Sequence, residues 1–239
     1  MELLDASGHK KTYTITRVKH EERSKRLAAT PFEFKILKGN IAYIAMNSFA
    51  TDSATRALAN NSKDISNANA IIIDVRNNGG GSTPWSILSF LIEKELPIQS
   101  WYARDYQPYE RAANHNQNFL SGVSILNSVG KSYYSKPVVM LTSSRTFSAA
   151  EDLVAAFKSV KRGMIIGTST GGSTGQPMNI GLPGNGSARI CTIRDMFADG
   201  EDFVGKGIQP DKLVAPTVAD IRKGVDTELD AALRYLSAK

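Results

Sequence analysis

The residues best suited to chemistry lie at two places where a predicted buried strand is followed by a predicted helix. One is the segment from Asp74 to Gly81, which ends in three consecutive glycines. The other runs from Thr142 to Glu151 and contains Ser148 at the start of an apolar helical pattern. At such a junction the first amide N–H groups of the helix have no partner within it, so they can stabilise negative charge.

The three glycines, Gly79 to Gly81, permit backbone angles closed to other residues and a close approach of the main chain to a ligand. Taken alone, they also fit a flexible turn. A phosphate cradle is disfavoured because no Gly-Lys-Ser/Thr follows and the Gly-x-Gly-x-x-Gly spacing is missing. No nucleotide or other cofactor, and no metal, is expected.

Ser148 has two interpretations, and the local sequence alone favours the structural one, a helix cap. Ser148-Ala149-Ala150-Glu151 fits a capping box, in which the serine hydroxyl and the Glu151 side chain each accept a hydrogen bond from the other's backbone. A nucleophile at a helix N-terminus gives the same pattern, because the amides that cap the helix can also hold an oxyanion.

The elements that position these residues alternate between strand and helix, which predicts an α/β fold built from ββα units. The run from Ala70 to Ile73 is apolar throughout, so that strand should be buried on both faces, in a sheet covered by helices. The segment from Gln99 to Asn118 is polar and rich in Tyr, and is expected to be a surface excursion. The other expected strands and helices span 32–36, 41–46, 51–62, 84–91, 137–141, 148–159, 164–166, 189–193 and 226–236.

The N-terminal part of the chain follows a different pattern. A turn at Ser7-Gly8 lies between Leu3-Leu4 and the alternating Thr12 to Thr16, which indicates a hairpin, and a charged run from Lys19 to Arg26 then indicates a linker. The sequence therefore predicts a tail and linker over residues 1–30 and one core domain over residues 31–239.

Composition excludes several classes of protein. The 239 residues are 41% hydrophobic and 22% charged, within the range of ordinary globular domains. The net charge of +6 is spread, and the densest basic stretch also holds Glu21 and Glu22, so a nucleic-acid partner is not expected. No apolar run approaches the roughly 20 residues of a membrane span. Cys191 is the single cysteine, which excludes an internal disulfide.

Five motifs occur in order along the chain: IAYIAMNSF, IIIDVRNNGGG, PVVMLTSSRTFSAAEDLVAAF, IIGTSTGGSTGQ and FVGKGIQPD. Together they resemble the S41 peptidases, a family that includes C-terminal processing proteases, the tricorn core protease and retinoid-binding interphotoreceptor repeats. The resemblance runs from about Phe32 to the C-terminus. It implies a ClpP/crotonase-like core, preceded in the family by a PDZ domain and an N-terminal helical cap. Leu3 to Arg17 resembles the last strands of such a PDZ domain.

The resemblance also implies roles for individual residues. Ser148 matches the serine nucleophile of the family's Ser-Ala-x-Glu motif, and Gly80 and Ala149 match the positions whose amides form the oxyanion hole. The implied substrate is an extended peptide or unfolded protein, which the glycine-rich stretch from Gly171 to Gly175 could receive as an added strand. Export across a bacterial inner membrane, to the periplasm or another extracytoplasmic space, is the family habit.

The general base does not carry over. One branch of the family has a lysine 25 residues after the serine, where this chain has Ser173. The tricorn-like branch takes a histidine from the cap and a glutamate whose position here is Val204. His115 and Lys206 are substitute candidates. A base from an upstream cap is the expected arrangement, because serine is a poor nucleophile without one.

Two other functions remain open at this point. A catalytically inactive module that binds a peptide or another ligand on the same fold would explain the missing lysine and glutamate. An acyl-CoA enzyme of the crotonase type shares the superfold, although nothing in the glycine-rich segments marks a nucleotide.

Overall fold

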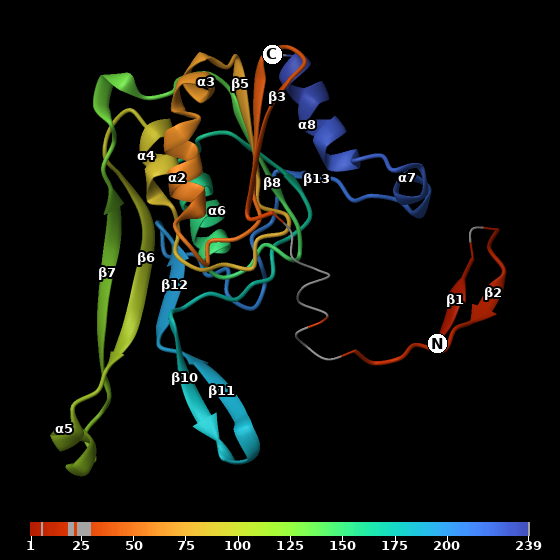
Figure 1. Ribbon diagram of the computed structural model, residues 1–239. Helices are drawn as coiled ribbons and strands as arrows, with labels where there is room; N and C mark the ends of the chain where they lie inside the picture. The colour runs from red at the N-terminus through yellow and green to blue at the C-terminus, as the bar shows by residue number, and fades with distance from the viewer. Residues whose placement is uncertain (6, 19–21, 23–29, 239) are drawn as a thin grey trace.

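The computed structural model describes residues 1–5, 7–18, 22 and 30–238, and is built around a six-stranded sheet (Figure 1). The strand order is β13-β9-β8-β5-β4-β3, and neighbouring strands are parallel except for the antiparallel pair β3 and β4. The strands are β3 (Phe32–Leu37), β4 (Ile41–Met46), β5 (Ala70–Asp74), β8 (Val138–Thr142), β9 (Met164–Gly167) and β13 (Lys212–Leu213). The mixed α/β architecture expected from the sequence is confirmed.

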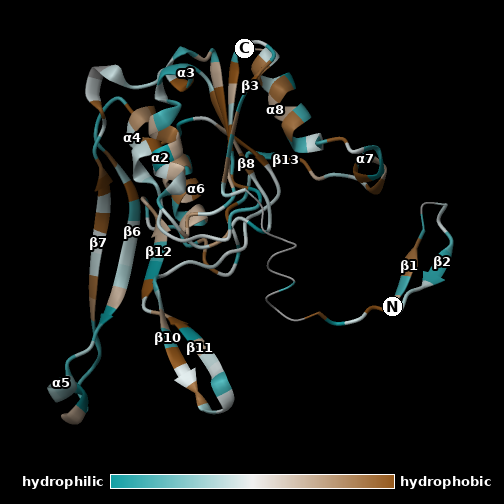
Figure 2. Cartoon of the chain, viewed as in Figure 1, coloured by the Kyte–Doolittle hydropathy of each residue, from teal (hydrophilic) through white to brown (hydrophobic). Residues whose placement is uncertain are grey.

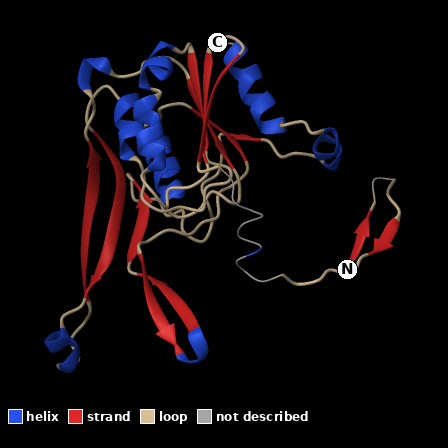
Figure 3. Cartoon of the chain, in the orientation of Figure 1, coloured by secondary structure: helices blue, strands red, loops and turns tan. Residues whose placement is uncertain are grey.

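Helices cover both faces of this sheet (Figures 1 and 3). On one face pack α2 (Ser53–Asn60), α3 (Ser62–Asn67), α4 (Trp85–Leu91) and α6 (Ala149–Ser159), and on the other packs α8 (Thr227–Ser237), preceded by the short α7 (Val218–Lys223). Every residue of β5 and β8 is buried, as the uninterrupted apolar run predicts for a strand covered on both sides. Figure 2 shows the hydrophobic residues concentrated along these central strands and on the helices beside them.

A second sheet and two hairpins stand beside the core. β12 (Ile193–Phe197), β6 (Leu96–Asp105) and β7 (Asn118–Leu126) form a three-stranded antiparallel sheet, with α5 (Pro108–Ala112) at the tip between β6 and β7. The surface excursion expected from Gln99 to Asn118 is therefore mostly an ordered strand and a tip helix. β10 (Pro177–Leu182) and β11 (Gly186–Cys191) pair only with each other. Single 3-10 turns occupy Gly130–Ser132 and Pro183–Asn185.

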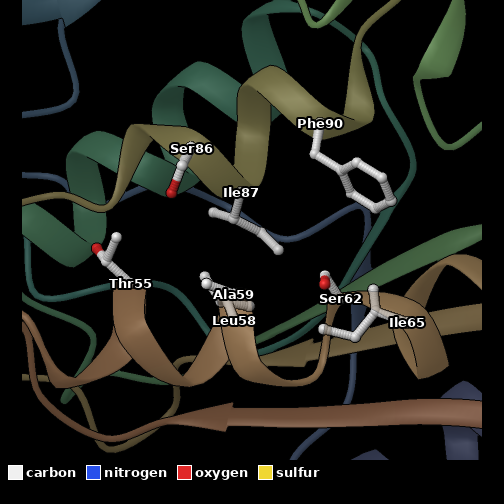
Figure 4. A pocket seen from close by; sticks show the side chains of 8 residues that line it. All are labelled: Thr55, Leu58, Ala59, Ser62, Ile65, Ser86, Ile87 and Phe90. Carbon is white, nitrogen blue, oxygen red and sulfur yellow. The ribbon is translucent and has the colours of Figure 1, made fainter.

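An apolar pocket of about 230 Å³ lies between α4 on one side and α2 and α3 on the other. Figure 4 shows Leu58 and Ile65 facing Ile87 and Phe90 across it. None of its lining residues is one of the chemical candidates of the sequence, and it lies within the packing of the helical layer.

The N-terminal residues form a small hairpin of β1 (Glu2–Leu4) and β2 (Lys10–Thr12), with Gly8 at φ 86° in its turn. Both strands are exposed along their whole length. Arg222 donates a hydrogen bond to the carbonyl of Asp5 at 2.9 Å and thereby joins the hairpin to the α7 region. Most of the predicted linker, residues 19–21 and 23–29, lies outside the described residues. Within the described part of the chain, no helix is long and apolar enough to cross a membrane.

Deletion of residues 1–29 should leave the stability of the core nearly unchanged. Among the described residues, the hairpin contributes exposed side chains and one exposed hydrogen bond to the rest of the molecule. Thr30 and Pro31, which accept hydrogen bonds from Asn47, are kept. We expect the melting temperature to fall by less than about 4 °C, since a 1 kcal/mol loss shifts a domain of this size by ~2 to 4 °C.

The same deletion should reduce any self-association, because Leu4 and Ile15 are 64% and 62% exposed and exposed apolar side chains near free strand edges favour pairing between molecules. Calorimetry and sedimentation at matched concentrations would measure the two effects. A fall of roughly 10 °C or more would show that the hairpin is integral to the core domain.

Candidate active site

The two junctions singled out in the sequence lie side by side at the carboxyl ends of β5 and β8, which are adjacent parallel strands. Figure 3 shows loops gathered at this end of the sheet. The Thr146 hydroxyl donates to the carbonyl of Val75 at 2.9 Å, and the Phe147 amide donates to the carbonyl of Asn78 at 2.9 Å. These bonds fix the glycine loop against the segment that leads into Ser148.

Ser148 is the N-cap of α6 and has an unusual backbone conformation, with φ 58° and ψ −128°. A non-glycine residue in such a region costs of order 1 to 3 kcal/mol and persists only where the surroundings enforce it. A serine on a sharp, strained turn between a strand and a helix presents its hydroxyl outward, as in nucleophile elbows. The backbone of Ser148 therefore has the kind of strained strand-to-helix turn that a nucleophile elbow has.

The Glu151 carboxylate enforces that turn. It is fully buried, and one oxygen accepts hydrogen bonds from the Thr170 hydroxyl and the Gly172 amide, both at 2.6 Å. The other oxygen accepts from the amides of Ser173 at 2.8 Å and Ser148 at 3.2 Å. Half of the capping box predicted from the sequence is thus present, because the Glu151 carboxylate accepts from the Ser148 amide, whereas the Ser148 hydroxyl forms no capping hydrogen bond among the described residues. The carboxylate does more than cap the helix, because it also binds the loop that follows β9.

Gly80 and Ala149, the two expected oxyanion residues, both lie against Ser148. A Cβ atom added to Gly80 would come within 2.6 Å of the Ser148 Cβ and 3.2 Å of the Ala149 nitrogen, so only glycine fits there. The Ala149 amide has no hydrogen-bond acceptor among the described residues. The Gly80 amide differs, since it donates to the Asn78 side-chain oxygen at 2.8 Å.

Asn78 explains how the glycine loop keeps its shape. Its side chain is completely buried, and its amide group donates to the carbonyl of Met46 at 2.8 Å. An asparagine immediately before glycines, in a loop that follows a strand, is a recognisable turn signal. This role of Asn78 was not predicted from the sequence.

A pocket of about 210 Å³ opens beside Ser148. It is lined by Phe147, Ser148, Ser173, Thr174, Pro177, Arg189 and Cys191. The last three come from the β10–β11 hairpin, so the pocket lies between that hairpin and the start of α6. No sequence signal could have identified Arg189 or Cys191, because only the folded hairpin brings them to the serine.

The candidate bases do not meet Ser148 in this pocket. Ser173 is there, and its carbonyl accepts from the Ser148 amide at 3.0 Å, but a hydroxyl replaces the family's lysine. Val204 packs against the core. His115 pairs with Glu110 at 2.6 Å next to α5, at the far tip of the β6–β7 hairpin (Figure 1). Lys206 is exposed and does not line the pocket.

Asp152, one residue after Glu151, is an acid with a raised pKa that contacts the pocket residue Thr174. It accepts hydrogen bonds from the Thr174 hydroxyl at 2.8 Å and from the Gln99 side chain at 3.3 Å. Burial raises the pKa of Asp152 to about 7, with further increases from the charges of Asp195 and Glu151, against the lowering effect of the two hydrogen bonds. Burial also raises the pKa of Asp195.

No group of three or more potential metal ligands occurs in the described part of the chain.

Comparisons of this chain with known proteins point to one protein family. Residues 40–214 match the family described as Peptidase family S41. The chain is 27% identical over 214 residues to the chloroplastic C-terminal processing peptidase of Tetradesmus obliquus, covering 88% of this chain and 41% of that protein. It is 25% identical to the carboxyl-terminal-processing protease of Picosynechococcus sp., covering 95% of this chain and 53% of the relative. The chain therefore spans about half or less of the length of these curated relatives.

Solved structures give the same result for the fold. A candidate peptidase from Parabacteroides merdae superposes with a TM-score of 0.73 at 26% identity, over 92% of this chain and 70% of that one. The photosystem II D1 C-terminal processing protease superposes with a TM-score of 0.56 at 22% identity, over 80% and 50% of the two chains.

Glu151→Gln should unfold the site or the whole domain at lower temperature. In the variant, an NH₂ group replaces one of the two carboxylate oxygens of Glu151. An NH₂ group cannot accept the hydrogen bonds that this oxygen accepts in the wild type, so buried donors are left unpaired. We expect a loss of about 2 to 4 kcal/mol and a melting temperature lower by roughly 5 to 15 °C. Glu201→Gln, at an exposed position, is the matched control and should change little. Equal melting temperatures for the two variants would contradict the anchoring role.

Asp152→Asn should change the pH dependence of stability. A buried acid whose pKa is raised in the folded state binds its proton more tightly there than in the unfolded chain, so its ionisation destabilises the fold as pH rises from about 4 to about 7. The asparagine variant avoids this cost, and its stability relative to wild type should increase across that window by at least ~1 kcal/mol and then level off. Urea titrations at about pH 4.5, 6 and 7.5 would measure the difference. A difference that is constant with pH would contradict the assignment.

Proposed function

We propose that this chain, which belongs to peptidase family S41, is a serine peptidase core for extended or unfolded polypeptides, with Ser148 as the nucleophile and a general base contributed by an upstream cap. The observation that carries the proposal is the strained Ser148 turn at the N-terminus of α6, beside an Ala149 amide without a partner among the described residues and an open pocket. A capping serine alone would need neither the positive φ nor the pocket.

In the proposed reaction the Ser148 Oγ forms a bond to the carbon of a peptide carbonyl while its proton passes to a base. The carbonyl oxygen becomes an oxyanion in the tetrahedral intermediate. When the carbonyl re-forms, the C–N bond breaks and the leaving amine takes up a proton, leaving an acyl ester on Ser148. Water then attacks the ester, releases the carboxylic acid and returns the proton to the serine.

Two amides would stabilise the oxyanion. The Ala149 amide is open and lies at the positive end of α6, so it is the first donor. The Gly80 amide is the second donor. It would turn from the Asn78 side-chain oxygen toward the oxyanion of the substrate, or form a bifurcated hydrogen bond to both oxygens. The glycine backbone, with Gly80 at φ 102°, makes such a rotation feasible.

An extended substrate would lie along the β10–β11 hairpin. In the part of the chain that the structure describes, each of these strands pairs only with the other and so retains one free edge. Both contribute residues to the Ser148 pocket. The stretch from Gly171 to Gly175, the edge suggested by the sequence, is a poorer acceptor. The amides of Gly171, Gly172 and Ser173 already donate to Thr146 and Glu151.

The base is proposed to come from a segment other than those that line the pocket. Arg189 and Cys191 are the titratable side chains in the pocket, and the guanidinium cannot accept a proton at neutral pH. The Glu151 oxygens are occupied by four donors. The family's N-terminal cap is the model for such a contribution.

We also infer that residues 31–239 form a ClpP/crotonase-like core and that residues 1–30 contain a remnant of a PDZ-like domain. We infer further that the protein acts in an extracytoplasmic compartment.

A binding module without catalysis is the second candidate. Ser173 and Val204 stand at the positions where the two branches of the family place a lysine and a glutamate, and this favours a site that holds a peptide or another ligand without cleaving it. The oxyanion donors and the pocket would then serve recognition.

Reaction with a fluorophosphonate probe distinguishes the two functions. The chain should acquire one adduct on Ser148 during extended incubation, located by peptide mapping, because the turn exposes the hydroxyl beside oxyanion donors. Ser148→Ala and heat-denatured wild type should acquire none. The absence of an adduct on the folded chain would favour the binding module.

Cleavage of casein by the isolated chain should be no faster than cleavage by Ser148→Ala, since no base meets the serine in the described residues. Cleavage that depends on Ser148 would overturn the proposed external base. His115→Ala and Lys206→Ala would then show whether either side chain supplies it.

A further inference from the structure

We propose that the pocket beside Ser148 is a specificity site for an acidic side chain, and that Arg189 binds the carboxylate of an aspartate or glutamate in the substrate. This inference rests on the proposed peptidase function, because it assumes that a polypeptide lies over Ser148. It adds the chemical class of the residue that sits next to the attacked carbonyl.

Charge is the first argument. Of the seven residues that line the pocket, Arg189 alone carries a permanent charge, and Ser173 and Thr174 add hydroxyl groups around it. A substrate side chain in this space therefore meets one guanidinium and no lining carboxylate. Guanidinium and carboxylate form two parallel hydrogen bonds, a geometry that neutral or cationic side chains cannot match.

The second argument is that Arg189 has no partner of its own. Among the described residues it forms no ion pair and no side-chain hydrogen bond, whereas Arg194, on the following strand, is paired with Asp202. The acidic side chains nearest in sequence to Ser148 are committed elsewhere. Glu151 accepts from backbone amides and a hydroxyl, and Asp152 accepts from Thr174 and Gln99.

Position gives the third argument. Arg189 belongs to β11, where it pairs in register with Asn179 of β10, so a strand rather than a loose loop presents it. The pocket volume of about 210 Å³ admits an aspartate or glutamate side chain beside Arg189, which lines it. A residue whose carbonyl is attacked by Ser148 has its own side chain within a few ångströms of the serine. The pocket is the space available to that side chain.

The test measures binding rather than cleavage, so it does not depend on an assembled catalytic base. Ser148→Ala is titrated with fluorescent peptides of one sequence that carry Asp, Asn or Lys at a single central position. We expect the Asp peptide to bind about fivefold to tenfold more tightly than the Asn peptide, and the Lys peptide to bind least well. Adding Arg189→Gln should remove this preference, and Arg189→Glu should reverse it toward Lys. Arg234→Gln, on the exposed surface of α8, is the matched control and should retain it.

Equal affinities for the Asp and Asn peptides, or a preference that survives Arg189→Gln, would overturn the acidic-pocket proposal. Either result leaves the peptidase proposal intact if the wild-type chain still forms the Ser148 adduct. Conversely, a charge preference that depends on Arg189, found in a chain that forms no adduct, would support the pocket as a recognition site while the peptidase proposal fails.

Discussion

The arrangement around Ser148 depends on one buried anion, the carboxylate of Glu151. Removing a carboxylate from water is costly unless its oxygens are hydrogen-bonded, and here four donors from two segments satisfy them. The Thr170 hydroxyl that donates to Glu151 also accepts from the Ile208 amide at 2.7 Å, so the same centre holds the segment that precedes β13. The carboxylate thus fixes the start of α6, the loop after β9 and the Ile208 segment in one geometry. The strained backbone of Ser148 is held in place by these contacts.

A second charged centre stabilises the other side of the glycine loop. Arg76 donates to both oxygens of Asp74 and to both oxygens of Asp226, and it lies 3.3 Å from Glu228. The bonds tie the end of β5 to the start of α8 across the sheet. The pKa of Asp226 is lowered because hydrogen bonds from Arg76 and from the Leu229 amide outweigh the effect of burial. The contact of Asn78 with Met46 fixes the segment that leads into Gly80. On the other side of the loop, the Phe49 amide donates to the Gly80 carbonyl at 3.0 Å and the Ser82 amide donates to the Phe49 carbonyl at 2.7 Å.

The fold was largely predictable from the sequence, because its signals are local. The apolar run from Ala70 to Ile73 and the capping pattern at Ser148 each correspond to an element of the structure within about one residue. Strand β6 was missed because polar residues occupy covered positions in it: Gln99 is buried and Ser100 is half-buried, so the strand has no continuous apolar run. At the site, the proximity of Ser148, Gly80 and Ala149 could be expected from the adjacent strands. The engagement of the Gly80 amide by Asn78 and the arrival of Arg189 could not, since both depend on how distant segments pack.

The central claim is that Ser148 is a nucleophile set beside the amides of Ala149 and Gly80. A crystal structure of the chain treated with a peptide boronate tests it most directly, since boronates form tetrahedral adducts with a reactive serine and imitate the intermediate. The predicted result is a boron bonded to the Ser148 Oγ, with one boronate oxygen about 3 Å from both amide nitrogens. Boronate bound at another residue, or an adduct whose oxygens lie farther than about 4 Å from both amides, would contradict the claim.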